Sequence, residues 1–387
     1  AKWAYPRLRL ATMSEFFRAL EKRYGAALPI HKKAWPDYWT DGAGSTAYET
    51  GLNRLAHDDL MTAEKLAAAA SLVENGAPFP KAEIRDGYAQ AMLFDEHTWG
   101  SQDSISEPEA EPVRGQWIQK SSHAYEAREI AGSVRDRSLA VLARGITTGD
   151  GRPLAVFNPL SWSRTDVVRV VLPRPLAERE GRFRLIDNRT GAEIPFQILD
   201  PNILMFRAEN VPSIGYAVFT AASGEPSAPA EAGAVVEDNR IENRFFQVTA
   251  DPVTGGLRSL VDKETGRELV DPASAFGLNQ LIYENPEGGR EAVDDRSKRA
   301  SFRRYSPESA AVSAGFRGPV ASSLVLSSQA FRFPDIRQEI ILYDDLKRID
   351  FVNRMRKEET TEAEAAYFAF PFRVENGRLR LEIADAV

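Results

Sequence analysis

The six residues from Asp95 to Gly100, Asp-Glu-His-Thr-Trp-Gly, concentrate chemically active side chains in one short stretch. Carboxylates and a neutral imidazole are ligands of zinc, so His97 is a candidate metal ligand. The Trp99 indole offers a flat face to an apolar or sugar-like ring. A simpler interpretation is a helix C-terminus, where His97 complements the helix dipole and Trp99 packs on a neighbouring element.

A second candidate site is the loop over residues 35–45, which is rich in tryptophan and glycine. A site for a sugar needs aromatic faces for the C–H side of the ring and carboxylates for its hydroxyls. Trp39 and Asp41, together with Asp37 and Tyr38, offer both kinds of group. Alternatively, these aromatic residues only anchor the loop to the neighbouring helices.

The other three histidines, His31, His57 and His123, are weaker candidates. His57 lies in the run His57-Asp58-Asp59 on a predicted helix, and charged runs on helices are usually solvated faces. His123 is interpreted as a surface residue for the same reason. The sequence contains no HExxH pair, no phosphate-binding glycine loop and no nucleophilic serine elbow.

Three predicted helices must position these candidates. The first begins after Ser45 as its N-cap and ends before Asn75-Gly76; the second covers residues 81–94 and the third residues 115–144. The apolar face of the third helix is expected to consist of Ile118, Tyr125, Ile130, Val134 and Val141. Three helices with short connections predict a bundle.

The flanking regions differ from the bundle. Thr12 followed by Glu15 has the form of a capping box, and a helix flanked by extended pieces in residues 1–30 resembles the last unit of an α/β domain. From Gly151 onward, β-branched and aromatic runs alternate with turn signals, which predicts an all-β region. We expect hairpin turns at residues 251–256 and 263–266 and a long exposed loop over residues 285–300.

Composition excludes several classes of protein. The chain has 387 residues, 43% of them hydrophobic, and a formal net charge of −7. A negative balance argues against a nucleic-acid partner or an anionic membrane surface, and no apolar run is long enough to span a bilayer. The absence of cysteine excludes disulfides and thiolate chemistry. It also fits a reducing compartment, so we expect a cytoplasmic protein.

Both ends of the sequence have the character of interior segments. The first residue is not methionine, and residues 379–387 stop within an alternating strand pattern. We therefore expect an internal piece of a longer protein.

A set of motifs in chain order resembles glycoside hydrolase family 38, the zinc-dependent α-mannosidases. The motifs are Tyr38-Trp39-Thr40, Ala63-Glu64-Lys65-Leu66, His97, Val156 to Trp162, Glu242 to Phe246, Gly255-Gly256-Leu257, Val261-Asp262-Lys263 and Ala366 to Phe372.

The resemblance implies an α+β multidomain fold. Residues 1–30 would be the tail of an α/β barrel-like catalytic domain, and residues 31–150 the entry loop and three-helix bundle. Residues 151–222 would form a small β domain, residues 223–234 a low-complexity linker, and residues 235–387 a large, truncated β-sandwich domain.

The resemblance also implies retaining hydrolysis of an α-mannoside. An aspartate nucleophile would form a covalent glycosyl-enzyme and a second carboxylic acid would protonate the leaving oxygen, both outside this chain. One zinc ion would be held by His97 and by ligands outside the chain. Trp39 would pack against the bound sugar and Tyr283 would reach the same pocket, so the candidate substrate-binding residues are Trp39, Asp41, Trp99 and Tyr283.

One departure from the family pattern leaves alternatives open. Thr98 follows His97 where the family usually has aspartate. A hydrolase of a related mannosyl compound is therefore one alternative, and a non-catalytic carbohydrate-binding or scaffold module is another. The aglycone, the linkage and the presence of a homo-oligomer stay open.

Overall fold

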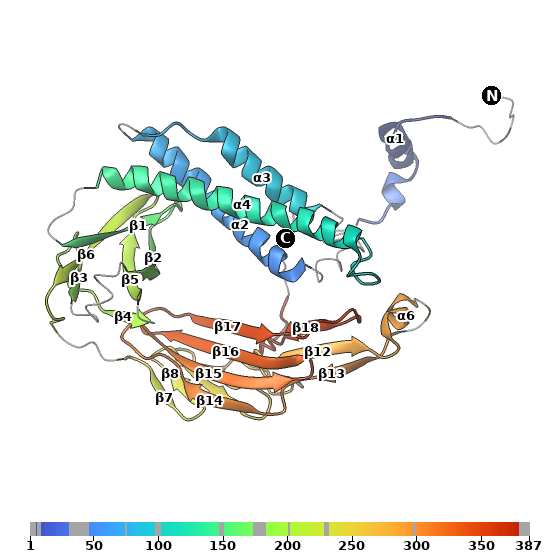
Figure 1. Ribbon diagram of the computed structural model, residues 1–387. Helices are drawn as coiled ribbons and strands as arrows, with labels where there is room; N and C mark the ends of the chain where they lie inside the picture. Colours follow the sequence, from blue (N-terminus) through green and yellow to red (C-terminus); the bar gives the residue numbers. More distant parts are fainter. Residues whose placement is uncertain are drawn as a thin grey trace. The chain divides into compact units, whose positions relative to one another are not determined.

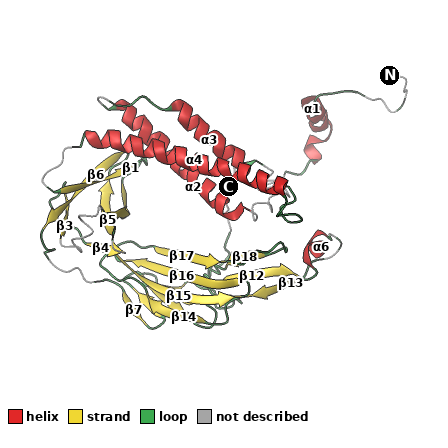
Figure 2. Cartoon of the chain, in the orientation of Figure 1, coloured by secondary structure: helices red, strands yellow, loops and turns green. Residues whose placement is uncertain are grey.

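The computed structural model describes residues 5, 9–30, 46–73, 76–96, 102–146, 151–172, 183–199, 202–227, 232–295, 297 and 299–378 (Figure 1). The chain divides into two compact units, residues 1–41 with 378–387 and residues 42–377. Helices occupy the first part of the described sequence and strands almost all of the rest, as the red and yellow segments of Figure 2 show. The mixed α and antiparallel β class predicted from the sequence is confirmed. The predicted domain boundaries stay predictions.

The first unit contains α1, residues Met13–Tyr24, and a short 3-10 helix, residues Gly25–Ala27. The predicted capping box is present. The backbone N–H of Glu15 donates to the Thr12 hydroxyl at 3.3 Å, and the Glu15 carboxylate accepts from the Thr12 backbone N–H at 2.9 Å. Residues 9–30 were expected to include extended pieces of a barrel-like domain. Within that range the structure contains these two helices and no strand.

In the second unit, α2 (Ala47–Leu72), α3 (Lys81–Asp95) and α4 (Glu111–Arg144) pack against one another, and we call them the helix cluster. Figure 1 shows the three as blue to green ribbons. Their shared core consists mainly of alanine, which lets the helix axes approach closely. Gly87 lies at one such close approach, because a Cβ there would lie 2.6 Å from Leu60 Cδ2.

Two details of the helix predictions are wrong. The helix begins at Ala47 with Thr46 as its N-cap residue, whereas Ser45, the predicted cap, lies outside the described residues. The predicted apolar face of α4 is also wrong in its first half, since Ile118 is 72% exposed and Tyr125 is 48% exposed. Small side chains such as Ala124 and Ala127 are buried instead, because they allow the close packing that larger ones would prevent.

Residues 152–223 form the small β unit, a pair of three-stranded antiparallel sheets. The orders are β1-β6-β3 and β2-β5-β4. One core joins the two sheets, with the rings of Phe206 and Phe219 meeting edge to face at 5.0 Å. The strands are β1 (Arg152–Asn158), β2 (Arg164–Val171), β3 (Phe183–Asp187), β4 (Phe196–Leu199), β5 (Ile203–Val211) and β6 (Gly215–Ser223).

Residues 235–368 form the large β unit, which has three antiparallel sheets. Their orders are β11-β10-β9-β8-β7, β14-β15-β16-β17 and β13-β12-β18. The strands are β7 (Val235–Glu237), β8 (Arg240–Glu242), β9 (Phe246–Ala250), β10 (Leu257–Asp262), β11 (Arg267–Glu268), β12 (Leu281–Pro286), β13 (Phe302–Tyr305), β14 (Ala310–Ala314), β15 (Ala321–Ala330), β16 (Phe333–Tyr343), β17 (Ile349–Arg356) and β18 (Ala365–Phe368).

The predicted hairpin turns are present in the large β unit. The backbone N–H of Asp251 donates to Gly256 O at 2.8 Å, and Gly255 and Gly266 have positive φ, the conformation that favours glycine. The predicted long loop over residues 285–300 is partly wrong. It contains the short helix α6 (Gly289–Asp294), which begins after Gly288 in the left-handed conformation.

A buried glutamine joins the small and large β units. The Gln197 side-chain oxygen accepts from the backbone N–H groups of both Val320 and Ala321 at 3.0 Å. Gln197→Leu would leave two buried N–H groups without an acceptor. We expect it to lower the free energy of unfolding by about 2–4 kcal/mol, measured with denaturant.

The matched control for this prediction is Gln247→Leu. The Gln247 amide donates to the Glu242 carboxylate at 3.1 Å, and Gln247 is only partly buried. Its replacement should change the free energy of unfolding by less than about 0.5 kcal/mol. If both variants lost the same free energy of unfolding, the Gln197 hydrogen bonds would contribute no more to stability than an ordinary partly buried contact.

Candidate functional site

The start of α2, which follows one predicted site segment, and the end of α3, which precedes the other, meet at one end of the helix cluster. The segments themselves, residues 31–45 and 97–101, lie outside the described residues, and with them the candidates Trp39, Asp41, His97 and Trp99. The end of α3 contacts the first turns of α2, where the Asn53 amide donates to the Asp95 carboxylate at 2.9 Å and to Ala91 O at 3.2 Å. This end of the cluster is therefore the candidate site.

Asp95, the last residue of α3, is held from α2 on both carboxylate oxygens. One oxygen accepts from Asn53, and the other lies 2.8 Å from His57 Nε2. Asn53 is 1% exposed, whereas the His57 and Asp95 side chains are about half exposed. His57 on α2 thus pairs with Asp95 on α3. The interpretation of His57-Asp58-Asp59 as a solvated helix face did not predict this pair.

Lys120 holds the same helix end from α4. Its ammonium donates to Leu93 O at 2.7 Å and pairs with the Glu96 carboxylate. The Lys120 side chain is only 11% exposed. The last carbonyl groups of a helix lack partners within the helix, and a cation is stabilised there, so Lys120 caps α3 from outside. Glu96 directly precedes His97 in the sequence.

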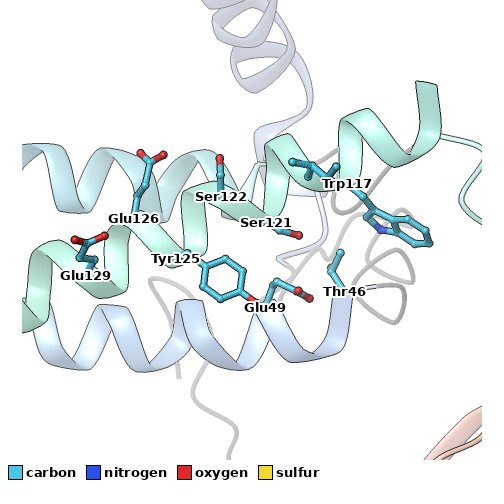
Figure 3. A pocket seen from close by; sticks show the side chains of 9 residues that line it. Thr46, Glu49, Trp117, Ser121, Ser122, Tyr125, Glu126 and Glu129 are labelled. Carbon is cyan, nitrogen blue, oxygen red and sulfur yellow. The ribbon is translucent and has the colours of Figure 1, made fainter. Parts of the chain in front are cut away.

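Between α2 and α4, the same end of the cluster carries a groove of about 650 Å³. Figure 3 shows the Tyr125 hydroxyl against the Glu49 carboxylate, and the Trp117 indole at the Thr46 end of the groove. Partial burial, followed by the Glu49 carboxylate, raises the pKa of the Tyr125 hydroxyl above its ordinary value. The lining residues are Thr46, Glu49, Trp117, Ile118, Ser121, Ser122, Tyr125, Glu126 and Glu129.

Tyr283, the fourth candidate substrate residue, lies in the large β unit. It is 0% exposed, and its hydroxyl donates to the Glu364 carboxylate at 2.7 Å. Burial first, and then Glu364, raises the pKa of Tyr283 well above its ordinary range. Its ring packs among Tyr305, Phe331 and Phe333. Its role in a substrate pocket stays a prediction.

The described residues do not complete a metal site. Within that part of the chain, no group of three or more His, Cys, Asp or Glu side chains could hold a metal ion. The Asp95 and Glu96 carboxylates beside His97 have partners on α2 and α4. The zinc prediction therefore depends on His97 and on residues beyond the described part.

None of the described helices is long and apolar enough to cross a membrane.

Comparisons with known proteins identify a similar family domain and similar solved structures. Residues 241–385 match the sequence model of the glycosyl hydrolases family 38 C-terminal domain. This part of the chain, less than half of its length, is similar to that domain. This match confirms the resemblance to family 38 that the sequence motifs indicate. A comparison with curated proteins gives no match.

Two solved structures share the fold over nearly the whole chain. One is a protein in glycosyl hydrolase family 38 from Enterococcus faecalis, with 16% identity and a TM-score of 0.62, covering 92% of this chain and 48% of its own. The other is an α-mannosidase from Enterococcus faecalis V583, with 15% identity, the same TM-score, and coverage of 93% and 47%. This chain thus spans about half the length of each.

Several residues at the candidate site were not found by sequence reasoning. Asn53 and Lys120 are buried polar residues on helices whose other buried positions are mostly apolar, and Trp117 and Glu49 line the groove. One signal was available, because a lysine among alanines at helical spacing conflicts with a purely apolar core. The direction in which each side chain faces depends on the helix packing.

Proposed function

We propose that this chain is the helical and β part of a retaining α-mannosidase that hydrolyses terminal α-mannosides. The observation that carries the proposal is the family 38 C-terminal domain, supported by an α-mannosidase of the same fold. In this proposal the substrate is a carbohydrate, and the nucleophilic aspartate and the acid that protonates the leaving oxygen lie outside the chain.

The proposed contribution of this chain is a set of sugar-binding and metal-binding groups. Trp39 and Trp99 would supply aromatic faces and Asp41 a carboxylate for sugar hydroxyls. His97 would be one ligand of a zinc ion, which when bound supplies a Lewis acid for the sugar hydroxyls. Asn53 and Lys120 fix the helix that leads into His97.

The proposal predicts a difference between this chain and the full-length protein. The full-length protein should hydrolyse an aryl α-mannoside with α-mannose as the first product, seen by NMR. The chain alone should not, because a catalytic zinc site uses about three protein ligands and the chain offers one histidine for it.

Two outcomes would overturn the proposal. Chelator-sensitive turnover by the chain alone would show that it contains a complete site. Absence of hydrolysis by the full-length protein, with sugar binding intact, would instead favour a non-catalytic carbohydrate-binding module. Turnover of another mannosyl compound in preference to simple mannosides would assign a role to Thr98.

A further inference from the structure

One end of the small β unit presents three large apolar side chains to solvent: Trp162 is 59% exposed, Ile214 67% and Tyr216 44%. We call these three residues the apolar tip. They lie in the connection between β1 and β2, in the connection between β5 and β6, and at the start of β6. Residues 151–172 and 202–227, which contain both connections, are described without a gap. Single exposed apolar residues are ordinary, whereas a group with tryptophan and tyrosine is typical of an interface.

Asn158 joins the two connections of the apolar tip. Its buried side-chain amide donates to Trp162 O at 2.7 Å and to Val211 O at 3.1 Å. The backbone N–H of Ile214 donates in turn to Leu160 O at 2.9 Å, from one connection to the other. These bonds fix the backbone that carries the tip before any partner is present. A surface fixed in this way loses little conformational entropy when it is covered.

Ile214 adopts a backbone conformation that its side chain disfavours. Its φ is 43°, in the left-handed region where glycine or asparagine is usual and a β-branched residue is a clear exception. The side chain is 67% exposed, so burial within this chain offsets little of the strain. Strained residues cluster at functional positions. The presence of isoleucine here is therefore best explained by a contact that the described residues do not provide.

The full-length protein supplies an occupant for the apolar tip. The two solved structures that share the fold are about twice as long as this chain, which covers 48% of one and 47% of the other. A protein of that length has a further part of similar size. Contacts between domains of one chain commonly bury several side chains of this kind on each side.

We propose that the apolar tip is a surface on which the part of the full-length protein outside this chain docks, with Trp162 and Ile214 at the centre of the contact. Exposed serines at positions 161, 163 and 213 surround these two side chains in sequence and would form the polar rim of the contact. The proposal rests on the proposed function only in taking the docked part to be the one that carries the nucleophile.

The first test measures whether the apolar tip is covered in the full-length protein. This chain has no cysteine, so Ser213→Cys introduces a single thiol into it, between Pro212 and Ile214. Thr265→Cys is the matched control, because Thr265 is exposed in the turn of the large β unit. A maleimide should label the thiol of Ser213→Cys at least about tenfold more slowly than that of Thr265→Cys in the native protein. Mass spectrometry of the two peptides measures the rates, which should be equal in denaturant.

The second test measures the contribution of the Ile214 side chain. Asparagine tolerates the left-handed conformation, so Ile214→Asn relieves the strain and removes the apolar group. In the full-length protein it should lower the melting temperature by about 2 °C or more, because a covered isoleucine is lost. Val253→Asn is the matched control, since Val253 is also β-branched and is 64% exposed. It should change the melting temperature by less than about 1 °C.

The outcomes separate this surface from the proposed function. Equal labelling of Ser213→Cys and Thr265→Cys would overturn the docking surface, as would a melting temperature that Ile214→Asn leaves unchanged or raises. Slow labelling that becomes fast when the protein is diluted to a monomer would also overturn it, because a second copy would then be the occupant. Slow labelling in a monomer that does not hydrolyse an aryl α-mannoside would support the docking surface and overturn the hydrolase.

Discussion

In the full-length protein, His97→Ala is expected to lower zinc content and hydrolysis of an aryl α-mannoside together, the rate by at least about 100-fold. The reason is that a missing ligand costs more than the 10–100-fold typical of residues that only support a ligand. His97 follows a helix end that is held from two sides, by Asn53 and by Lys120. Elemental analysis of the purified protein measures the metal directly.

His123→Ala is the control for this prediction. His123 Nδ1 lies 2.6 Å from the Gln90 side-chain oxygen on α3. Its replacement should leave zinc content and rate unchanged. Equal metal in wild type and His97→Ala would remove His97 from the site. A rate loss without metal loss would instead make it a residue that contacts the sugar.

The elements with strong local signals could be predicted from the sequence. The second helix was predicted over residues 81–94 and forms over Lys81–Asp95. Thr12 and Glu15 make the predicted capping box, and the glycines at 255 and 266 take up positive φ in the predicted turns. These features depend on the types of a few neighbouring residues, so they can be predicted from the local sequence alone.

The orientation of α4 could not be predicted in the same way. Periodicity places Ile118 and Tyr125 inward together with Val134, and of these three only Val134 is buried. The structure buries Ala124, Ala127 and Ala131 instead, because α2 and α3 approach closely around Leu60 and Gly87. At Ile118 and Tyr125, a large apolar side chain therefore does not coincide with a buried position. The exposed Ile118 and Tyr125 line the groove between α2 and α4.

Some motifs that resemble family 38 have a structural reason in this chain. Within Val156 to Trp162, the buried Asn158 amide donates to Trp162 O at 2.7 Å and to Val211 O at 3.1 Å. It thereby joins the end of β1 to the end of β5. The motif thus identifies the fold of the small β unit, and it gives no information about the reacting groups.

The last prediction concerns the Glu96–Lys120 pair, whose two partners differ in burial. The Lys120 side chain is 11% exposed and the Glu96 side chain 36%. Glu96→Ala leaves a buried ammonium without its counter-charge, and we expect it to lower the free energy of unfolding by about 2–3 kcal/mol. Lys120→Met removes the charge and keeps an apolar stem near the Phe94 ring, so it should cost about 1 kcal/mol or less.

Glu83→Ala provides the reference for an exposed pair, because Glu83 and Arg137 are both about half exposed and should contribute less than about 1 kcal/mol. Denaturant unfolding of the three variants decides the order. Equal costs for Glu96→Ala and Lys120→Met would show that the pair acts through its contact alone. A larger cost for Lys120→Met would show that capping Leu93 O dominates. The expected order follows if the buried Lys120 ammonium requires the Glu96 carboxylate as its counter-charge. The stability of the helix cluster then depends on Glu96, the residue directly before His97.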